Sequence, residues 1–90
     1  MTDRVVTVGT TATKLLDIMA SRKEVRLENQ GAVVVYCGPR EVATSGTRGG
    51  WTLDPNETAT MIASEDPESI KEELYGIVAA GTCNVHVKEA

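Results

Sequence analysis

The sequence predicts an all-β fold, a small antiparallel β-sandwich or barrel of about six to eight short strands. Strand-like segments recur every ~8 to 12 residues with turn residues between them. Charged and apolar side chains alternate with period two through residues 22–29. The apolar fraction of 41% contains no Phe and is rich in Val, Ala, Ile and Leu, which suit thin sheet packing. Ninety residues fit one domain.

The N-terminal segment begins with strand-like residues 4–8, which Gly9 to Thr11 end. Residues 12–20 are ambiguous. Their apolar side chains fit one face of a short helix, or an extended segment that crosses the end of a sandwich. We expect residues 1–20 to form an arm or first strand that reaches a neighbouring subunit, and residues 21–90 to form the sandwich. Deletion of residues 1–13 is then expected to weaken binding and leave the sandwich folded.

The clearest pattern lies in SRKEVRLENQGAVVVYCGP, Ser21 to Pro39. Period-two alternation gives its first half an inner face and a wet outer face. The inner face carries Lys23, Val25, Leu27 and Asn29, and the outer face carries Arg22, Glu24, Arg26 and Glu28. Asn29 to Gly31 supplies a turn. Residues 32–37 lack alternation, which predicts a central strand covered on both faces. The stretch is therefore predicted to be a hairpin.

The middle of the chain reads as loop, strand, turn and strand. Residues 41–50 are loop-like, and residues 51–53 predict a brief strand. Asp54 to Glu57 predicts a turn with Pro at its second position. Residues 58–63 are β-prone.

The last third predicts one short helical turn and one hairpin. Asp66 is suited to cap a helix that has Pro67 at its first position, so we expect a short helical turn near 67–74. A final hairpin is predicted around Gly81 and Thr82. Its last strand has two faces: Cys83, Val85 and Val87 point inward, and Asn84, His86 and Lys88 point outward.

The charge balance disfavours several partners. The formal net charge is −4, from 9 basic and 13 acidic residues, which argues against a nucleic-acid or anionic membrane partner. The apolar runs are shorter than the ~20 residues that span a bilayer. The N-terminus lacks the apolar core of a signal peptide. We expect a protein made in a cytoplasm-like compartment, which it leaves only within a larger assembly.

No constellation of residues points to catalysis, a cofactor or a metal. The single histidine, His86, has no ligand partners at suitable spacing. The serines lack a nucleophile elbow, and no phosphate-binding glycine motif is present. The acidic residues of segment 65–73 do not match a calcium loop. Cys37 and Cys83 match no zinc or redox spacing, so buried reduced thiols are favoured over a disulfide or metal binding. We expect a protein that is not an enzyme.

Two features suggest a contact surface. Trp51 follows a Gly-Gly pair and is either a core plug at one end of the sandwich or an exposed anchor for a partner. The charged face of the first hairpin strand forms either cross-strand salt pairs or a polar subunit contact. The candidate interface residues are Arg4, Arg22, Glu24, Arg26, Glu28 and Trp51.

Beyond these patterns, three segments taken together resemble small virion proteins of tailed bacteriophages. The segments are SRKEVRLENQGAVVVYCGP, GGWTLDPNET and ELYGIVAAGTCNVHVKE. The matching positions are Ser21 to Lys23, Asn29 to Gly31, Val35 to Gly38, Leu53 to Glu57, Leu74 to Ile77, and Gly81 to Glu89. They span about three-quarters of the chain, from Ser21 onward. Asn56 stands where Gly is usual, and residues 67–73 are an insertion.

The resemblance implies a non-enzymatic bacteriophage virion structural protein, and in particular a capsid decoration (cement) protein on the capsid surface. Its implied partners are the major capsid protein and itself, as a homotrimer. A fibre or tail-associated protein, or a β-sandwich module that binds a receptor or carbohydrate, is the alternative.

Overall fold

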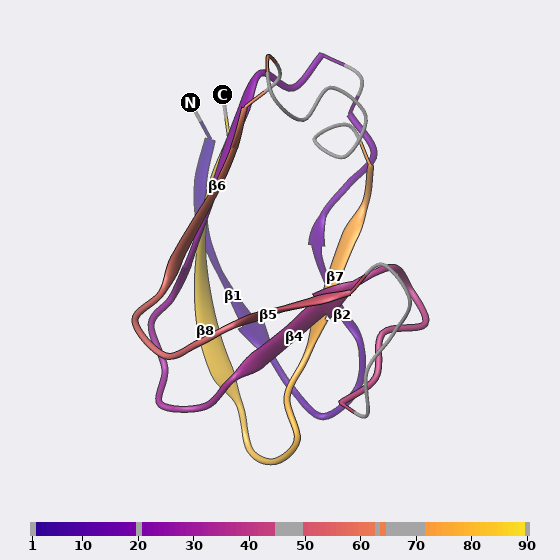
Figure 1. Ribbon diagram of the computed structural model, residues 1–90, viewed down its shortest axis with the longest axis vertical. Coiled ribbons are helices and arrows are strands. Elements are labelled where there is room, and N and C mark those ends of the chain that lie inside the picture. The colour runs from indigo at the N-terminus through magenta and orange to yellow at the C-terminus, as the bar shows by residue number, and fades with distance from the viewer. Residues whose placement is uncertain (1, 20, 45–49, 63, 65–71, 90) are drawn as a thin grey trace.

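The computed structural model describes residues 2–19, 21–44, 50–62, 64 and 72–89, and these form a β-sandwich (Figure 1). The predicted all-β class is confirmed. Within the described residues there are eight strands and no helix. The strands are β1 (Thr2–Val8), β2 (Thr13–Leu16), β3 (Glu24–Asn29), β4 (Val35–Gly38), β5 (Trp51–Leu53), β6 (Thr58–Ile62), β7 (Leu74–Ile77) and β8 (Cys83–Glu89).

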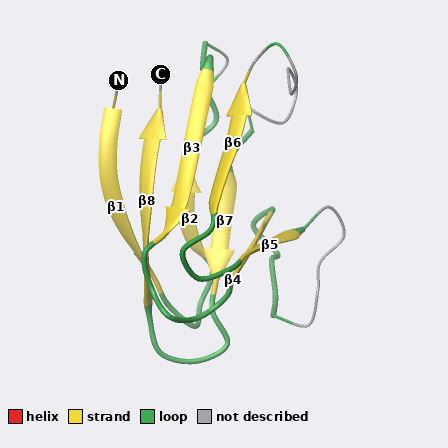
Figure 2. Cartoon of the chain, turned by 60° about the vertical axis from the view of Figure 1, so that its left-hand side comes forward, coloured by secondary structure: helices red, strands yellow, loops and turns green. Residues whose placement is uncertain are grey.

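The strands form two antiparallel sheets of four. Sheet A has the order β1-β8-β3-β6, and sheet B has the order β2-β7-β4-β5. Figure 2 shows the four strands of sheet A side by side. β8 and β3 are its central strands, so the alternation predicted for them sets the two faces of this sheet. Side chains of β8 and β3 are buried or turned outward as predicted from Glu24 onward.

The core lies between the sheets and is made of small aliphatic side chains. Val25, Leu27, Val85 and Val87 of sheet A and Leu15, Leu16, Val35 and Leu53 of sheet B are buried in it. Burial of each such side chain contributes roughly 1.5 to 3 kcal/mol. Gly76 lets β7 pack closely here, since a Cβ at Gly76 would lie 3.1 Å from both Leu15 and Val35. A core without Phe therefore fills a thin space between two sheets.

The predicted hairpins are wrong, because both turns cross between the sheets. β3 pairs with β6 and β8, whereas β4 pairs with β5 and β7. In the same way, β7 lies in sheet B and β8 in sheet A. Of consecutive strands, β4 and β5 alone share a sheet within the described chain. Alternation reports which side of a strand is buried, and this signal is the same for a hairpin and for a crossing connection.

The connection from β3 to β4 is long enough to cross. The predicted strand was expected to begin at residue 32, but β4 begins at Val35. Residues 30–34 therefore span the ~10 Å that separates packed sheets. We call residues 29–34 the arch.

The N-terminal residues belong to both sheets. β1 is an edge strand of sheet A and pairs with β8 along its whole length, from Thr2 opposite Glu89 to Val8 opposite Cys83. β2 is an edge strand of sheet B, so the extended alternative for residues 12–20 holds at 13–16. Deletion of residues 1–13 would remove an edge strand and the buried Val8, so it would also perturb the sandwich.

The predicted helical turn falls mostly on residues 65–71, which lie outside the described residues. Its expected end at residues 74–76 is instead part of β7. Among the described residues, no helix has the length and apolar character needed to cross a membrane.

The turn between β5 and β6 forms as predicted. The Glu57 amide donates to the Asp54 carbonyl at 2.9 Å, and the Asp54 amide donates to the Glu57 side chain at 2.8 Å. Asn56 has a φ of 65°, a left-handed conformation that Asn adopts more readily than most residues. These hydrogen bonds and the conformation of Asn56 close the turn at the predicted position.

Asn29 holds the arch together and is fully buried. Its Nδ2 donates to the carbonyls of Val33 at 2.8 Å and Leu53 at 2.9 Å. Its Oδ1 accepts from the Gly31 amide at 2.9 Å and from the Cys83 thiol at 2.8 Å. One side chain thus satisfies polar groups from the arch, β5 and β8. The sequence indicated a turn residue here, but not this role between the sheets.

Gly31 lies close to Cys83 in the arch, and we expect Gly31→Ala to lower the free energy of unfolding by about 2 kcal/mol. A Cβ at Gly31 would clash with the Sγ of Cys83 and lie 3.3 Å from its Cβ. Chemical denaturation of Gly31→Ala, Cys83→Ala and the double variant measures this. The penalty in the double variant should be smaller than the sum of the two.

Gly9→Ala is the matched control, because no atom lies within 4 Å of a Cβ at Gly9. Its stability should change by less than about 0.5 kcal/mol. Strict additivity of Gly31→Ala and Cys83→Ala would contradict the predicted clash.

The two cysteines are free and buried, so we expect no reaction of either thiol with a disulfide reagent in the folded protein at pH 8. Burial raises the pKa of the Cys37 thiol to about 12, which leaves almost no thiolate. Two thiols should react after unfolding in denaturant and one in Cys37→Ser, measured by the absorbance of the released thiolate. Rapid labelling of the folded protein would contradict the described packing.

Candidate functional site

The outer face of sheet A carries a polar surface built from three neighbouring strands. β3, β8 and β6 turn Glu24, Arg26, Glu28, Asn84, His86, Lys88, Thr58 and Thr60 away from the core, because alternate side chains of a strand point to opposite faces. Three of the six predicted interface residues, Glu24, Arg26 and Glu28, therefore lie together on this face.

The register places like charges beside each other. Arg26 lies directly opposite Lys88 on β8 and opposite Thr60 on β6. On the next outward row, Glu28 lies opposite His86 and Thr58. Like charges in directly opposed positions destabilise a sheet. The sequence predicted that Arg26, Glu28, His86 and Lys88 point outward, but the topology was needed to show that they are neighbours.

These side chains line a shallow open hollow. Its volume is about 410 Å³, and its lining consists of Arg26, Glu28, Thr58, Thr60, His86 and Lys88. We call it the Arg26–Lys88 hollow.

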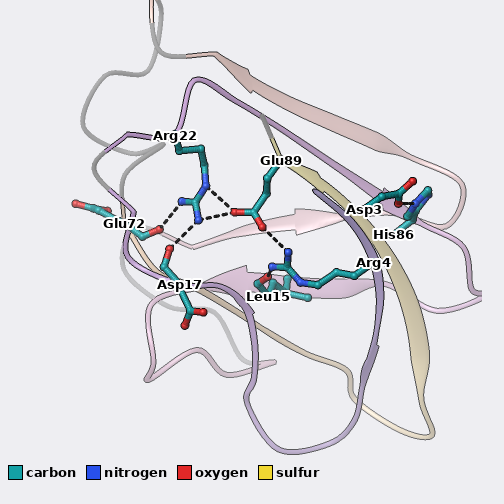
Figure 3. A network of polar contacts seen from close by, with 8 residues as sticks. All are labelled: Asp3, Arg4, Leu15, Asp17, Arg22, Glu72, His86 and Glu89. Carbon is teal, nitrogen blue, oxygen red and sulfur yellow. Dashed lines mark hydrogen bonds and ion pairs between the residues drawn. The ribbon is translucent and has the colours of Figure 1, made fainter. Parts of the chain in front are cut away.

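The acidic side chains beside the hollow do not neutralise Arg26 and Lys88 equally. Asp3 lies opposite Lys88 in the register, but its carboxylate contacts the His86 ring (Figure 3). Arg26 lies 3.7 Å from Glu24. Within the described part of the chain, Lys88 forms no ion pair. Among the described residues, the positive charges of Arg26 and Lys88 are therefore only weakly neutralised by neighbouring carboxylates.

Arg4 and Arg22 lie elsewhere, at Glu89 (Figure 3). The Nε of Arg22 donates to Oε1 of Glu89 at 2.8 Å, while Nη1 of Arg4 contacts Oε2. The prediction that Arg22 lies on the wet outer face is wrong, since Arg22 is 2% exposed. The physical reason is that β3 begins at Glu24, so its alternation does not extend back to Arg22. We call Arg4, Arg22 and Glu89 the arginine clamp.

The two arginines of the clamp share one carboxylate, and backbone carbonyls accept their remaining hydrogen bonds. The Nη2 of Arg22 donates to the Asp17 carbonyl at 2.8 Å, and the Nη2 of Arg4 donates to the Leu15 carbonyl. Burial alone would raise the pKa of Glu89, but hydrogen bonds from Arg4 and Arg22 and their charges outweigh it, so the pKa is lowered. The clamp is thus an ionised group of three at the end of the sandwich away from Asn29.

Trp51 takes neither predicted extreme. It is half-buried at the start of β5, opposite Cys37, and packs against the core. β5 is the edge strand of sheet B, so Trp51 does not belong to the polar face of sheet A. Trp51 therefore covers part of the core and stays partly exposed at the edge of sheet B.

Sequence reasoning missed a second charged group, on sheet B. Lys14 Nζ lies 5.9 Å and the Arg40 guanidinium 5.8 Å from the centre of the Tyr75 ring. Glu73 lies 3.9 Å from Lys14 and 3.5 Å from Arg40. A hydrogen bond to Asp17 raises the pKa of Lys14, and a hydrogen bond to Tyr75 raises that of Arg40. No spacing in the sequence indicated this grouping, because the residues come from three separate segments.

Among the described residues, no three His, Cys, Asp or Glu side chains are grouped so that they could hold a metal ion. Comparison with protein-family models, with curated proteins and with solved structures found no match to this chain.

Proposed function

We propose that this protein is a structural component of a tailed-bacteriophage virion, a decoration protein that binds the outside of the capsid. The observation that carries the proposal is the broad, shallow, charged outer face of sheet A. A surface of this shape suits contact with another protein, where area and complementarity decide binding.

The resemblance of three segments to virion proteins supports the same function. Each of these segments lies where the chain passes from one sheet to the other. Residues 21–39 contain Arg22 of the clamp and the arch. Residues 53–57 contain the turn between β5 and β6, and the Leu53 carbonyl at its start accepts a hydrogen bond from Asn29. Residues 74–89 supply β7 and the central strand β8. Each motif thus contains a connection that crosses between the sheets: β3 to β4, β5 to β6, and β7 to β8.

The edges of the sandwich support self-association, proposed here as a trimer. β1 is a seven-residue edge strand, and its Val5 is 56% exposed. An open strand edge is a template for pairing with another chain, and symmetric association removes it from solvent. A bound oligomer stabilises the assembled shell by mass action, because it binds the assembled state preferentially.

Add-back to virus heads tests the proposal. Heads from a phage that encodes this chain, prepared without its gene product, should lose integrity on heating earlier than complete heads. The purified protein should restore resistance and appear in regular positions by electron cryomicroscopy. Light scattering of the free protein should give the mass of a trimer. Heads that neither bind the protein nor change in heat resistance would refute the capsid function.

A further inference from the structure

We propose that the Arg26–Lys88 hollow binds a single Asp or Glu carboxylate on the surface of a partner protein. This assignment of partner chemistry rests on the proposed function for its biological setting, while the binding site itself rests on the geometry of sheet A. It adds a site and a ligand class to the general contact face described above.

The first argument is electrostatic. Arg26 and Lys88 are direct cross-strand partners, so their charges repel each other, and an anion between them would offset this repulsion. Arg26 is half-exposed, with 52% of its side chain accessible, and its contact with Glu24 at 3.7 Å is an exposed pair of low strength. A carboxylate placed between the two cations would replace repulsion by two attractive contacts.

The second argument is the geometry of donors. Arg presents planar, paired N–H groups that match a carboxylate, and Lys adds a further cationic donor. Thr60 lies opposite Arg26, and Thr58 lies on the next outward row, so two hydroxyl groups face the same hollow. The Thr hydroxyls can donate to an oxyanion, or accept from its neighbouring amides.

The third argument concerns which anion fits. The chain carries a net charge of −4, which opposes a long polyanion such as a nucleic acid. This field is screened over about 8 to 10 Å at physiological salt, so a single carboxylate in direct contact is affected less. Glu28, Glu24 and Asp3 border the cations and would repel an extended anionic chain. A protein segment with an isolated acidic side chain meets these conditions.

Nuclear magnetic resonance titration tests the inference. A blocked peptide with one glutamate among glycines is added to the folded protein at constant ionic strength, with the same peptide carrying glutamine instead as the neutral control. The amide signals of Thr58, Thr60, His86 and Lys88 should shift saturably, with a dissociation constant of about 1 mM. The glutamine peptide should leave these signals unchanged.

Charge-removing variants identify the site. Arg26→Gln and Lys88→Gln should each weaken peptide binding about fivefold. Lys23→Gln removes the same charge from an exposed position outside the hollow and should bind like wild type. The thermal midpoints of Arg26→Gln and Lys88→Gln should equal or exceed that of wild type, because each removes repulsion. Absence of saturable shifts, or equal weakening in Lys23→Gln, would overturn the site.

Further ligands separate the sources of anion and the two proposals. Tighter binding of inorganic phosphate or of a single-stranded oligonucleotide than of the glutamate peptide would overturn the carboxylate assignment. Heads that bind wild-type protein and Arg26→Gln equally would overturn the role of the hollow and leave the capsid function intact. Saturable peptide binding by a protein that fails to bind heads would refute the capsid function and leave the hollow intact.

Discussion

Glu89→Gln is expected to lower the free energy of unfolding by about 3 kcal/mol, because it leaves two arginines without their shared anion. Arg22 is buried, and its guanidinium reaches Glu89, the Asp17 carbonyl and the Glu72 carbonyl. The glutamine side chain has similar size, so the loss comes from charge and hydrogen bonding and not from a cavity. Urea unfolding followed by far-ultraviolet circular dichroism measures the change.

Glu24→Gln is the matched control for this prediction. Glu24 also pairs with an arginine on sheet A, but at 3.7 Å and on the exposed face. Its loss should cost less than about 0.5 kcal/mol. Similar destabilisation by the two variants would contradict a special contribution of the arginine clamp.

The same clamp makes stability depend on acid. The pKa of Glu89 is lower in the folded protein than the ordinary glutamate value of 4.5. A carboxylate with a lowered pKa stabilises the fold fully above its unfolded pKa, and this contribution is lost as the pH falls through the folded pKa. Wild type should therefore lose stability as the pH falls below about 4.5, and Glu89→Gln should lose less over the same range. Parallel curves for the two proteins would contradict this assignment.

Asn29→Ala is expected to destabilise the protein by about 3 kcal/mol or more. The substitution removes four hydrogen bonds of a fully buried side chain and leaves the Val33 carbonyl, the Leu53 carbonyl and the Gly31 amide without this partner. Each buried polar group left unsatisfied costs about 1 to 3 kcal/mol. Water that enters the space would reduce the sum. Urea unfolding, with Trp51 fluorescence as a second probe, measures the change.

Gln30→Ala is the control at the neighbouring position. Gln30 is exposed and its side chain contacts Glu28 at 3.3 Å, so the expected change is below about 0.5 kcal/mol. Asn29→Ala with wild-type stability would show that the arch does not depend on the Asn29 side chain.

The alternation of side chains predicted which residues face the core, and the structure confirms it for β3 and β8. Alternation depends on the single strand, so it can be read without knowing the partners. Pairing depends on distant segments. The predicted hairpins failed for this reason: residues 30–34 of the arch resemble an ordinary turn, whereas the partners of β3 are the distant strands β6 and β8, of which β8 lies more than fifty residues away.

The candidate sites follow the same division. Arg26 and Glu28 were identified as outward-facing charges, and they line the hollow. Thr60 and Lys88 lie on other strands, so only the strand register shows that they are neighbours of Arg26. The clamp was hidden more deeply, because Arg22 and Glu89 are 67 positions apart and Arg22 lies just before its strand begins.

The position of β8 at the centre of sheet A has a consequence for biosynthesis. β1 pairs along its length with β8, and β3 pairs with β8 on the other side, so neither strand can complete its hydrogen bonding until residues 83–89 have left the ribosome. β1 therefore waits for β8 to be translated. Until β8 has emerged, the apolar faces of β1 and β3 lack their sheet partner and are open to contact with other nascent polypeptides.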